Sequence, residues 1–411
     1  MHPTDQTKAA SVLHWDGKDP FPFYETLRAQ GSPVWDAKAN AWLVLDFQQC
    51  VEAEASEDVF GNIYANADPI LAQIKGGTAN ITFSQGEEHA RLRRFHLALL
   101  AARPVESYRL NHVRPVMDFV FNRLVPRGKG DLVKDMAAQI VPRVICSLMG
   151  MPWEDDRAIA RILELNDCIL RFVGANYRGD ELRQQALDAS AELNAMLRPH
   201  VRARRENPGD DFISRVWQEA PSEYGDDLTE DDAIAICREL YFAASDTTIH
   251  GTANALYLLL SDGAIRTQVV ADRDRALKSL VEEGLRLYNV VQLRHRIAKQ
   301  DTEMGGKHIR KGDMVLMVHA AANRDPGHYG CPAQADLGRK LAADHLAFGR
   351  GPRSCVGAQL ARVEMREIVN AVLDRLPNVR LDPEAAPPHF AGFYIRSHQP
   401  LNVRWDECAP S

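Results

Sequence analysis

The sequence has no paired cysteines. Its 411 residues include seven cysteines, an odd number, and no two of them form a Cys-x-x-Cys pair. This pattern excludes a disulfide framework and a zinc ribbon, and it indicates a reducing compartment. No uninterrupted apolar run approaches the ~20 residues that a membrane-spanning helix needs. The polar N-terminus also has no apolar stretch typical of a signal peptide, so we expect a cytoplasmic protein that contacts no membrane.

The chain also has only a small excess of one charge sign over the other. Lys and Arg number 49 and Asp and Glu number 56, which leaves a net charge of -7. Such mild acidity argues against nucleic acid as a partner. Internal repeats and low-complexity linkers are absent too, and the apolar and charged fractions, 45% and 26%, are ordinary for a globular chain. We expect one large domain over residues 1–411, in which residues 1–14 are loosely packed.

Helical periodicity covers most of the chain. Helices are predicted over Phe21–Gln30, Glu87–Leu100, Pro104–Leu124, Leu132–Met149, Asp156–Val173, Asp180–Glu206, Thr229–Leu260, Arg273–Tyr288 and Ala358–Leu376. Alternating patterns and turn residues predict strands within Pro33–Leu45, Thr302–His319 and Phe390–Trp405. The predicted fold is therefore mainly α with a small β-rich region.

One loop carries most of the chemical information. It runs from Phe348 through Cys355 to Gly357 with the pattern Phe-Gly-x-Gly-x-Arg-x-Cys-x-Gly, and a helix follows. Two glycines allow a tight turn and close approach to a planar ligand, and a helix N-terminus favours a thiolate. A lone cysteine without a Cys or His partner suits an axial bond to haem iron better than a zinc site. The competing interpretation is a buried cysteine after a glycine turn.

This loop resembles the haem-binding loop of the cytochrome P450 superfamily, specifically of its soluble bacterial members. The resemblance implies that Cys355 is the proximal ligand of a haem b iron, with Phe348 and Gly357 packed around the sulfur. Arg353 stands where bacterial members more often have His, and it implies a donor to a haem propionate. The resemblance also implies the P450 fold from about Trp15 to Trp405.

Further motifs resemble the same family and follow in its order. Glu283 and Arg286 lie three residues apart on one helix face, and they resemble a Glu-x-x-Arg pair that holds a meander arginine, here Arg339. His89 and Arg93 share a face at a spacing of four and resemble a propionate-binding pair. By alignment, Arg296 is a third propionate ligand.

The helix Thr229–Leu260 has an acid and an alcohol in its apolar middle. Asp246 and Thr247 are unfavourable there unless they are used or satisfied, and Thr can bond to the carbonyl four residues back and open the helix locally. They resemble the acid–alcohol pair that supplies protons during oxygen activation. Ala244 replaces the family's usual glycine, and capping or surface roles are the competing interpretation.

The resemblance implies a monooxygenase that inserts one oxygen atom from dioxygen into a small or medium hydrophobic substrate, aromatic or terpenoid-like, by hydroxylation or O-dealkylation. Electrons would come ultimately from NAD(P)H through a separate ferredoxin or flavodoxin and its reductase. Alternatives are a peroxide-driven peroxygenase and a non-catalytic haem-binding sensor. By alignment, the substrate-pocket candidates are Ile70, Leu71, Ile74, Ile81, Leu170, Phe172, Val173, Phe242, Ala243, Val291, Leu293, Phe393 and Ile395.

A local basic face on this chain is predicted to bind the redox partner. It comprises Arg91, Arg94, Arg350, Arg362 and Arg366, near His89 and Cys355, on a chain that is acidic as a whole. For Glu239, two helical turns before Asp246, a pocket position and a paired or solvated carboxylate both stay open.

Overall fold

The computed structural model describes residues 11–12, 19–64, 68–77, 79–174, 179–220, 228–340 and 342–406. The helices and helical turns are α1 Phe21–Arg28, α2 Phe47–Ala55, α3 Pro69–Ile74, α4 Gly86–Leu99, α5 Ala102–Tyr108, η1 Arg109–Val113, α6 Arg114–Leu124, η2 Val125–Arg127, η3 Leu132–Ala137, α7 Ala138–Leu148, α8 Asp156–Gly174, α9 Asp180–Glu206, α10 Phe212–Glu219, α12 Glu230–Ser261, α13 Gly263–Ala271, α14 Arg273–Leu287, α15 His319–Ala322, η4 Gly351–Arg353 and α16 Ala358–Arg375. This mainly α architecture confirms the predicted fold class.

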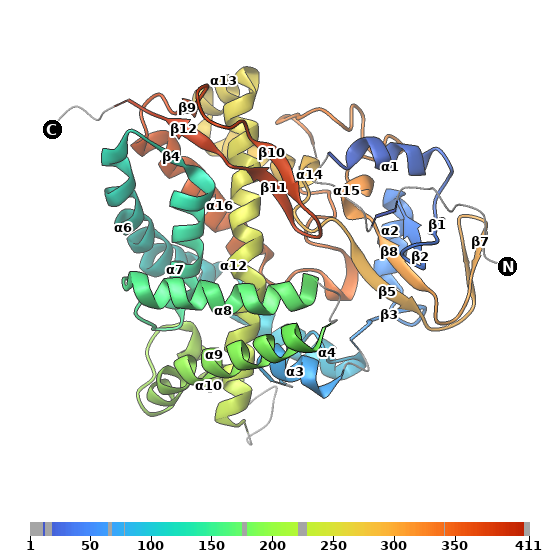
Figure 1. The fold of residues 1–411 in the computed structure, drawn as a ribbon, viewed down its shortest axis with the longest axis horizontal. Coiled ribbons are helices and arrows are strands. Elements are labelled where there is room, and N and C mark those ends of the chain that lie inside the picture. Colours follow the sequence, from blue (N-terminus) through green and yellow to red (C-terminus); the bar gives the residue numbers. More distant parts are fainter. Residues whose placement is uncertain are drawn as a thin grey trace.

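The strands are short. They are β1 Val34–Asp36, β2 Ala41–Val44, β3 Phe60–Gly61, β4 Lys129–Asp131, β5 Arg294–Ala298, β6 Thr302–Met304, β7 Lys307–Ile309, β8 Met314–Met317, β9 Arg380–Leu381, β10 His389–Gly392, β11 Arg396–Gln399 and β12 Asn402–Arg404. The largest sheet has the order β1-β2-β8-β5-β3, and the pair β10-β11 forms a separate hairpin. In Figure 1 the large sheet occupies one side of the molecule and the helices fill the other.

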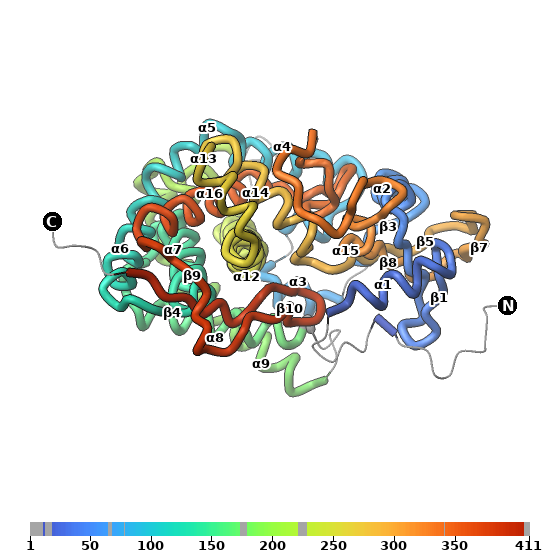
Figure 2. The backbone as a smooth tube through the Cα atoms, turned by 90° about the horizontal axis from the view of Figure 1, so that it is seen from above, coloured from blue at the N-terminus to red at the C-terminus, as the bar shows by residue number. Residues whose placement is uncertain are grey.

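The helix α12 runs through the middle of the helical part, and Figure 2 looks along its axis. It packs against α7, α9, α14, α16 and β11, so it reaches most of the core. Its start is a capping box, in which Thr229 N donates to Asp232 Oδ2 at 3.0 Å and Asp232 N donates to Thr229 Oγ1 at 3.1 Å. Its contacts with α14 and α16 bring it against the helix of Glu283 and Arg286 and the helix that follows Cys355.

Two local expectations need correction. The segment predicted as one helix over Pro104–Leu124 contains a π-helical turn, η1, between α5 and α6. Part of the N-terminal segment is also firmly packed, because Ser11 Oγ donates to Asp36 Oδ2 at 2.7 Å and Val12 is buried in a core cluster. The other residues of 1–14 lie outside the described part of the chain.

Candidate functional site

Cys355 lies between η4 and the start of α16. Its backbone N–H donates to Phe348 O at 2.7 Å, which closes the loop. Gly349 and Gly351 have φ values of +69° and +68°, where a side chain would be strained. A Cβ at Gly351 would lie 2.7 Å from the backbone oxygen of Glu54, at the end of α2. The glycines therefore let the loop cross α2, and their close approach to a planar ligand stays a prediction.

Gly357 lies next to the Cys355 sulfur. A Cβ on Gly357 would have the Cys355 Sγ, at 3.9 Å, as its one neighbour within 4 Å. Burial raises the pKa of the Cys355 thiol, and this effect outweighs Arg294, the Gly357 N–H and Arg93, which lower it. Coordination to a metal ion deprotonates such a thiol outright, so this setting suits a ligand that is ionised by its metal.

Two arginines hold the loop against α4 and the segment before it. Arg93 donates from Nη1 to Ser354 O at 2.5 Å and from Nη2 to Ser354 Oγ at 2.8 Å. Arg353 donates from Nη2 to Ser84 O at 2.9 Å and forms an ion pair with Glu57. Both side chains therefore lie beside Cys355, as the predicted propionate ligands should.

His89 and Arg296 complete a buried cluster in which the arginines carry the positive charge and His89 is a neutral imidazole. Burial, together with Arg353 and Arg93, lowers the pKa of His89 to about 4. Arg296 donates from Nη1 to His295 O at 3.0 Å, while its buried Nε has no hydrogen-bond partner in the described part of the chain. Buried polar groups without partners are costly, and carboxylates satisfy them well. The cluster beside Cys355 therefore fits haem, whose propionates are carboxylates.

The Glu-x-x-Arg pair is fully buried. Arg286 donates from Nε to Glu283 Oε1 at 2.7 Å and from Nη2 to Glu283 Oε2 at 2.8 Å. Arg339 donates from Nε to Glu283 Oε1 at 3.2 Å. Arg286 Nη1 also donates to Pro332 O at 2.7 Å. The pair therefore connects α14 to the coil that contains Pro332 and Arg339, which we call the meander segment.

The predicted basic face is smaller than expected. Arg362 donates from Nε and Nη2 to the two carboxylate oxygens of Glu282 at 2.7 and 2.8 Å. Its guanidinium also lies 4.4 Å from the centroid of the Phe348 ring. Arg350 forms an ion pair with Asp344. Arg350 and Arg362 therefore hold the cysteine loop rather than facing solvent as unpaired charges, which corrects the expectation.

The middle of α12 carries the predicted acid–alcohol pair, Asp246 and Thr247. Thr247 Oγ1 donates to Ala243 O at 2.8 Å, the predicted bond to the carbonyl four residues back. The helix stays regular there, so the bond does not open it, contrary to expectation. Asp246 Oδ1 lies 3.4 Å from His250 Nε2, and His250 Nδ1 is 2.7 Å from Ser397 Oγ. Ala243, on the same helix, is exposed.

The predicted pocket residues divide by burial. Ile74, Phe172 and Leu293 are buried in core clusters, and their place in the pocket stays a prediction. The side chain of Val173 lies outside the described residues. Leu71 and Ile81 are buried, and Phe393 is 39% exposed. Partly or fully exposed candidates are Ile70, Leu170, Phe242, Ala243, Val291 and Ile395.

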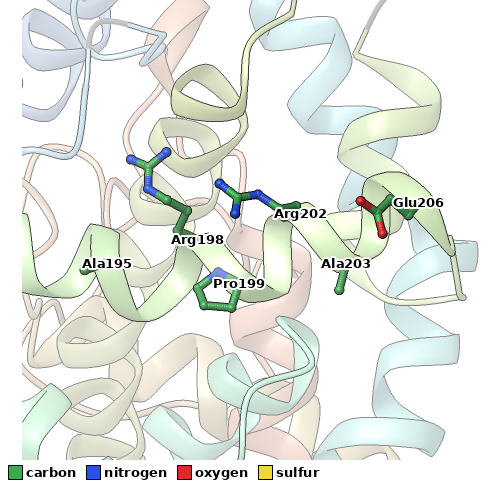
Figure 3. Close-up of a pocket in the computed structure, with 6 residues that line it drawn as sticks. All are labelled: Ala195, Arg198, Pro199, Arg202, Ala203 and Glu206. Atoms are coloured by element: carbon green, nitrogen blue, oxygen red, sulfur yellow. The ribbon is translucent and has the colours of Figure 1, made fainter.

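Two surface grooves in the described part of the chain lie away from this site. Figure 3 shows one of them along α9, where Arg198 and Arg202 point to the same side of the helix. Both arginines form ion pairs with Glu230 at the start of α12, so they serve helix packing. The second groove lies between α2 and the β6-β7 hairpin. Neither contains a residue of the candidate site.

A helical fold with a lone cysteine at the start of a helix, beside a buried cationic cluster, defines a haem-thiolate class of protein. A model of the family "Cytochrome P450" matches residues 61–392. The chain is 30% identical to pulcherriminic acid synthase of Bacillus subtilis, over 94% of this chain and 95% of that protein. It is 31% identical to cytochrome P450 monooxygenase PikC of Streptomyces venezuelae, over 94% and 91%. The chain belongs to the cytochrome P450 family, and its similarity to relatives that are named monooxygenases identifies it as a P450 monooxygenase.

The solved structures agree on the fold. The structure of CalO2 has a TM-score of 0.85 at 23% identity and covers 98% of this chain and 100% of that one. CYP109E1 from Bacillus megaterium in complex with corticosterone has a TM-score of 0.81 at 25% identity, over 94% and 98%. No helix in the described residues is long and apolar enough to cross a membrane.

Sequence reasoning missed several residues of the site. Arg294 alternates with Arg296 on a strand, and this spacing of two could have revealed it. His250 follows Asp246 by four residues on α12, a spacing that also predicts contact. Glu54 carried no local signal, because only the folded chain brings it against Gly349 and Gly351 of the cysteine loop.

Proposed function

We propose that this P450 binds one haem b through Cys355 and oxidises a small or medium hydrophobic substrate by hydroxylation or O-dealkylation. The reaction consumes dioxygen and two electrons from NAD(P)H, and it places one oxygen atom in the product and the other in water. The electrons come through a separate ferredoxin or flavodoxin and its reductase. The observation that carries the proposal is the position of Arg93 and Arg353 beside the Cys355 loop. The roles of Asp246 and Thr247 follow from the resemblance of their motif to the family's acid–alcohol pair.

The haem, when bound, supplies the activation of dioxygen and the oxidising power. The chain supplies position and protons. His89, Arg93, Arg296 and Arg353 would hold the propionates, because Arg is suited to bidentate carboxylate recognition. Thr247 would hold a proton on Oγ1 near the reacting centre, and Asp246 would exchange protons with His250.

The reduced carbon monoxide complex tests the cysteine assignment. Thiolate ligation gives a strongly red-shifted Soret band, and we expect that band from the wild type. Cys355→His should bind haem without it, whereas Cys50→Ala, a buried cysteine of the sheet core, should keep it. A retained band in Cys355→His would refute the assignment.

Turnover separates the remaining alternatives. A monooxygenase forms product with dioxygen, NAD(P)H and an added ferredoxin and reductase. A peroxygenase would form it from hydrogen peroxide with equal or greater efficiency and would not need the Asp246–Thr247 pair. A sensor would show Soret shifts with ligands but no product under either condition.

A further inference from the structure

A buried carboxylate–imidazole pair supports the cysteine loop from the side of α14. His345 Nε2 lies 3.0 Å from Glu282 Oε2, and both side chains are buried. His345 comes shortly before Phe348, and the backbone N–H of Ala347 donates to His345 Nδ1 at 3.2 Å. An imidazole nitrogen that accepts a hydrogen bond carries no proton, so the ring proton is on Nε2 and is donated to Glu282. The imidazole therefore connects the loop backbone to the carboxylate of Glu282.

Glu282 has a second partner, Arg362 of α16. Arg362 donates from Nε to Glu282 Oε1 at 2.7 Å and from Nη2 to Glu282 Oε2 at 2.8 Å. Burial raises the pKa of the Glu282 carboxyl, but the hydrogen bonds from His345 and Arg362 outweigh burial and lower this pKa to about 2. Glu282 is therefore ionised at neutral pH and neutralises the guanidinium of Arg362.

The neutralised guanidinium lies beside the residue that closes the cysteine loop. The Arg362 guanidinium carbon is 4.4 Å from the centroid of the Phe348 ring, and the His345 ring is 6.1 Å from the same centroid. Phe348 O accepts from Cys355 N at 2.7 Å, so Phe348 contacts both Arg362 and the backbone of Cys355. Burial raises the pKa of the Cys355 thiol, and Arg362 is one of three arginines that lower it.

The charges of Arg362 and Glu282 act on Cys355 in opposite directions. A cation beside a thiolate stabilises the negative charge on sulfur and weakens the donation of that charge to a metal ion. A carboxylate bound to the cation cancels this effect. Water screens buried charges poorly, so a pair in contact with the loop changes the electron density that the sulfur can donate.

We propose that Glu282 is a positioning residue that keeps the Cys355 thiolate a strong electron donor by neutralising Arg362. This inference rests on the proposed ligation of haem iron by Cys355. Reduction of a ferric haem adds one electron, so an unneutralised guanidinium nearby would favour the reduced state, and Glu282 keeps the reduction potential low. A strongly donating thiolate is the feature by which haem-thiolate oxygenases favour cleavage of the O–O bond.

A purely structural role is the alternative, because the Glu282–Arg362 pair also joins α14 to α16. The two roles differ in the sign of their effects. Removing Glu282 leaves a cation near Cys355, and removing Arg362 leaves an anion there. Tuning by charge therefore moves the two variants in opposite directions, whereas a loosened loop moves both in the same direction.

The experiment measures the one-electron reduction potential of the haem-loaded enzyme by spectroelectrochemical titration. Glu282→Gln should increase the equilibrium constant for reduction about threefold to tenfold, where tenfold corresponds to ~59 mV, and Arg362→Met should decrease it by a similar factor. Arg362→Lys keeps the positive charge and should stay within about twofold of wild type. The infrared C–O stretch of the reduced carbon monoxide complex should rise in Glu282→Gln and fall in Arg362→Met, because it reports thiolate donation without turnover.

Two further variants control for packing. The double variant Glu282→Gln/Arg362→Met leaves no unpaired charge at the pair, so its potential should return to about the wild-type value. Glu283→Gln is the matched control, because Glu283 is the adjacent residue and is also buried in an arginine pair, with Arg286. The haem-loaded fraction of Glu283→Gln should keep the wild-type potential even where its haem content is reduced.

Three results would overturn the proposal. The first is a potential that moves in the same direction in Glu282→Gln and Arg362→Met, or in neither. The second is an equal potential in Arg362→Met and Arg362→Lys, a comparison that stays available if Glu282→Gln does not bind haem. The third is a double variant without the thiolate carbon monoxide band, because the pair would then be required for the fold of the loop. A wild type without that band would instead refute the ligation by Cys355.

Discussion

At the scale of single residues, Asp246 is held by a partner that the family motif did not predict. His250 lies between Asp246 Oδ1 at 3.4 Å and Ser397 Oγ at 2.7 Å, so its imidazole is fixed from both sides. A carboxylate in contact with an imidazole can exchange a proton with it, and this gives the acid of the pair a defined orientation. His250 is therefore a positioning residue for Asp246.

Thr247→Ala should uncouple electron consumption from product formation. The variant keeps Asp246 but loses the hydroxyl, so we expect normal haem content, wild-type substrate affinity, continued NAD(P)H oxidation and release of hydrogen peroxide. General acid catalysis is typically worth ~10²–10⁴-fold, so product per NAD(P)H should fall at least tenfold. Thr252→Ala is the control, because Thr252 makes the same type of bond, to Thr248 O at 2.8 Å, one turn further along α12. Unchanged coupling in Thr247→Ala would contradict the proton role.

Asp246→Asn should slow turnover and increase its solvent isotope effect. His250→Asn removes the imidazole that contacts Asp246. This variant should shift the pH profile of turnover without altering substrate affinity. Ser397→Ala removes the other anchor of the imidazole and should have a smaller effect in the same direction. If the His250 variant had the wild-type pH profile, the contact with Asp246 would have only a packing role.

Glu364 gives a stability prediction independent of turnover. Burial raises the pKa of this carboxyl on α16 to about 8, and its Oε1 has no hydrogen-bond partner in the described residues. In the unfolded chain the group ionises near pH 4.5, so the folded state loses stability as the pH rises from about 4.5 to about 8. At 1.36 kcal/mol per pKa unit, the loss is on the order of 2–5 kcal/mol.

Glu364→Gln should remove that loss. The thermal midpoint of the variant relative to wild type should rise steadily between pH 5 and about pH 8.5. Glu303→Gln, at an exposed position on β6, is the control and should show a flat difference. A flat difference for Glu364→Gln would mean that the carboxyl is already ionised in the folded protein.

At the scale of elements, the helices with long periodic sequence patterns were predicted best. The pattern over Asp180–Glu206 is long and regular, and α9 has the predicted bounds. The helices α2, α3, α10 and α13 were not predicted, because segments of six to nine residues give few repeats of a helical pattern. The Glu283–Arg286 contact was predictable from its spacing of three, whereas the Arg362–Glu282 pair joins two helices distant in sequence and left no local signal.

The link between α14 and the meander segment should control haem incorporation. Breaking a buried ion pair costs ~3–5 kcal/mol, since the remaining charge stays buried without its partner. Glu283→Gln should therefore reduce haem content and lower the thermal midpoint, and Arg339→Ala should have a milder effect because Arg339 is only partly buried. Arg380→Ala, in an exposed pair with Asp406, is the control. Full haem loading in Glu283→Gln would show that the link does not hold the cysteine loop.

At the scale of the whole molecule, an acidic chain must still attract an electron donor to the side of Cys355. Arg93 binds Ser354 and so brings α4 against the cysteine loop, which places Arg94 and Arg366 on nearby elements. Arg94 is exposed and Arg366 is partly exposed, donating from Nε to Arg362 O at 3.0 Å. Arg94 and Arg366 therefore stay candidates for steering an acidic partner.

Charge reversal tests this reduced face. Arg94→Glu and Arg366→Glu should each slow reduction by an acidic ferredoxin severalfold at low salt, and the effect should fade as the Debye length decreases from ~10 Å at 0.1 M to ~3 Å at 1 M salt. Substrate affinity should not change, because rim charges act mainly on the association rate. Lys129→Glu is the control, since β4 lies far from α4 in Figures 1 and 2. A reduction rate that does not respond to salt, or that is equal in all three variants, would place the partner on another face.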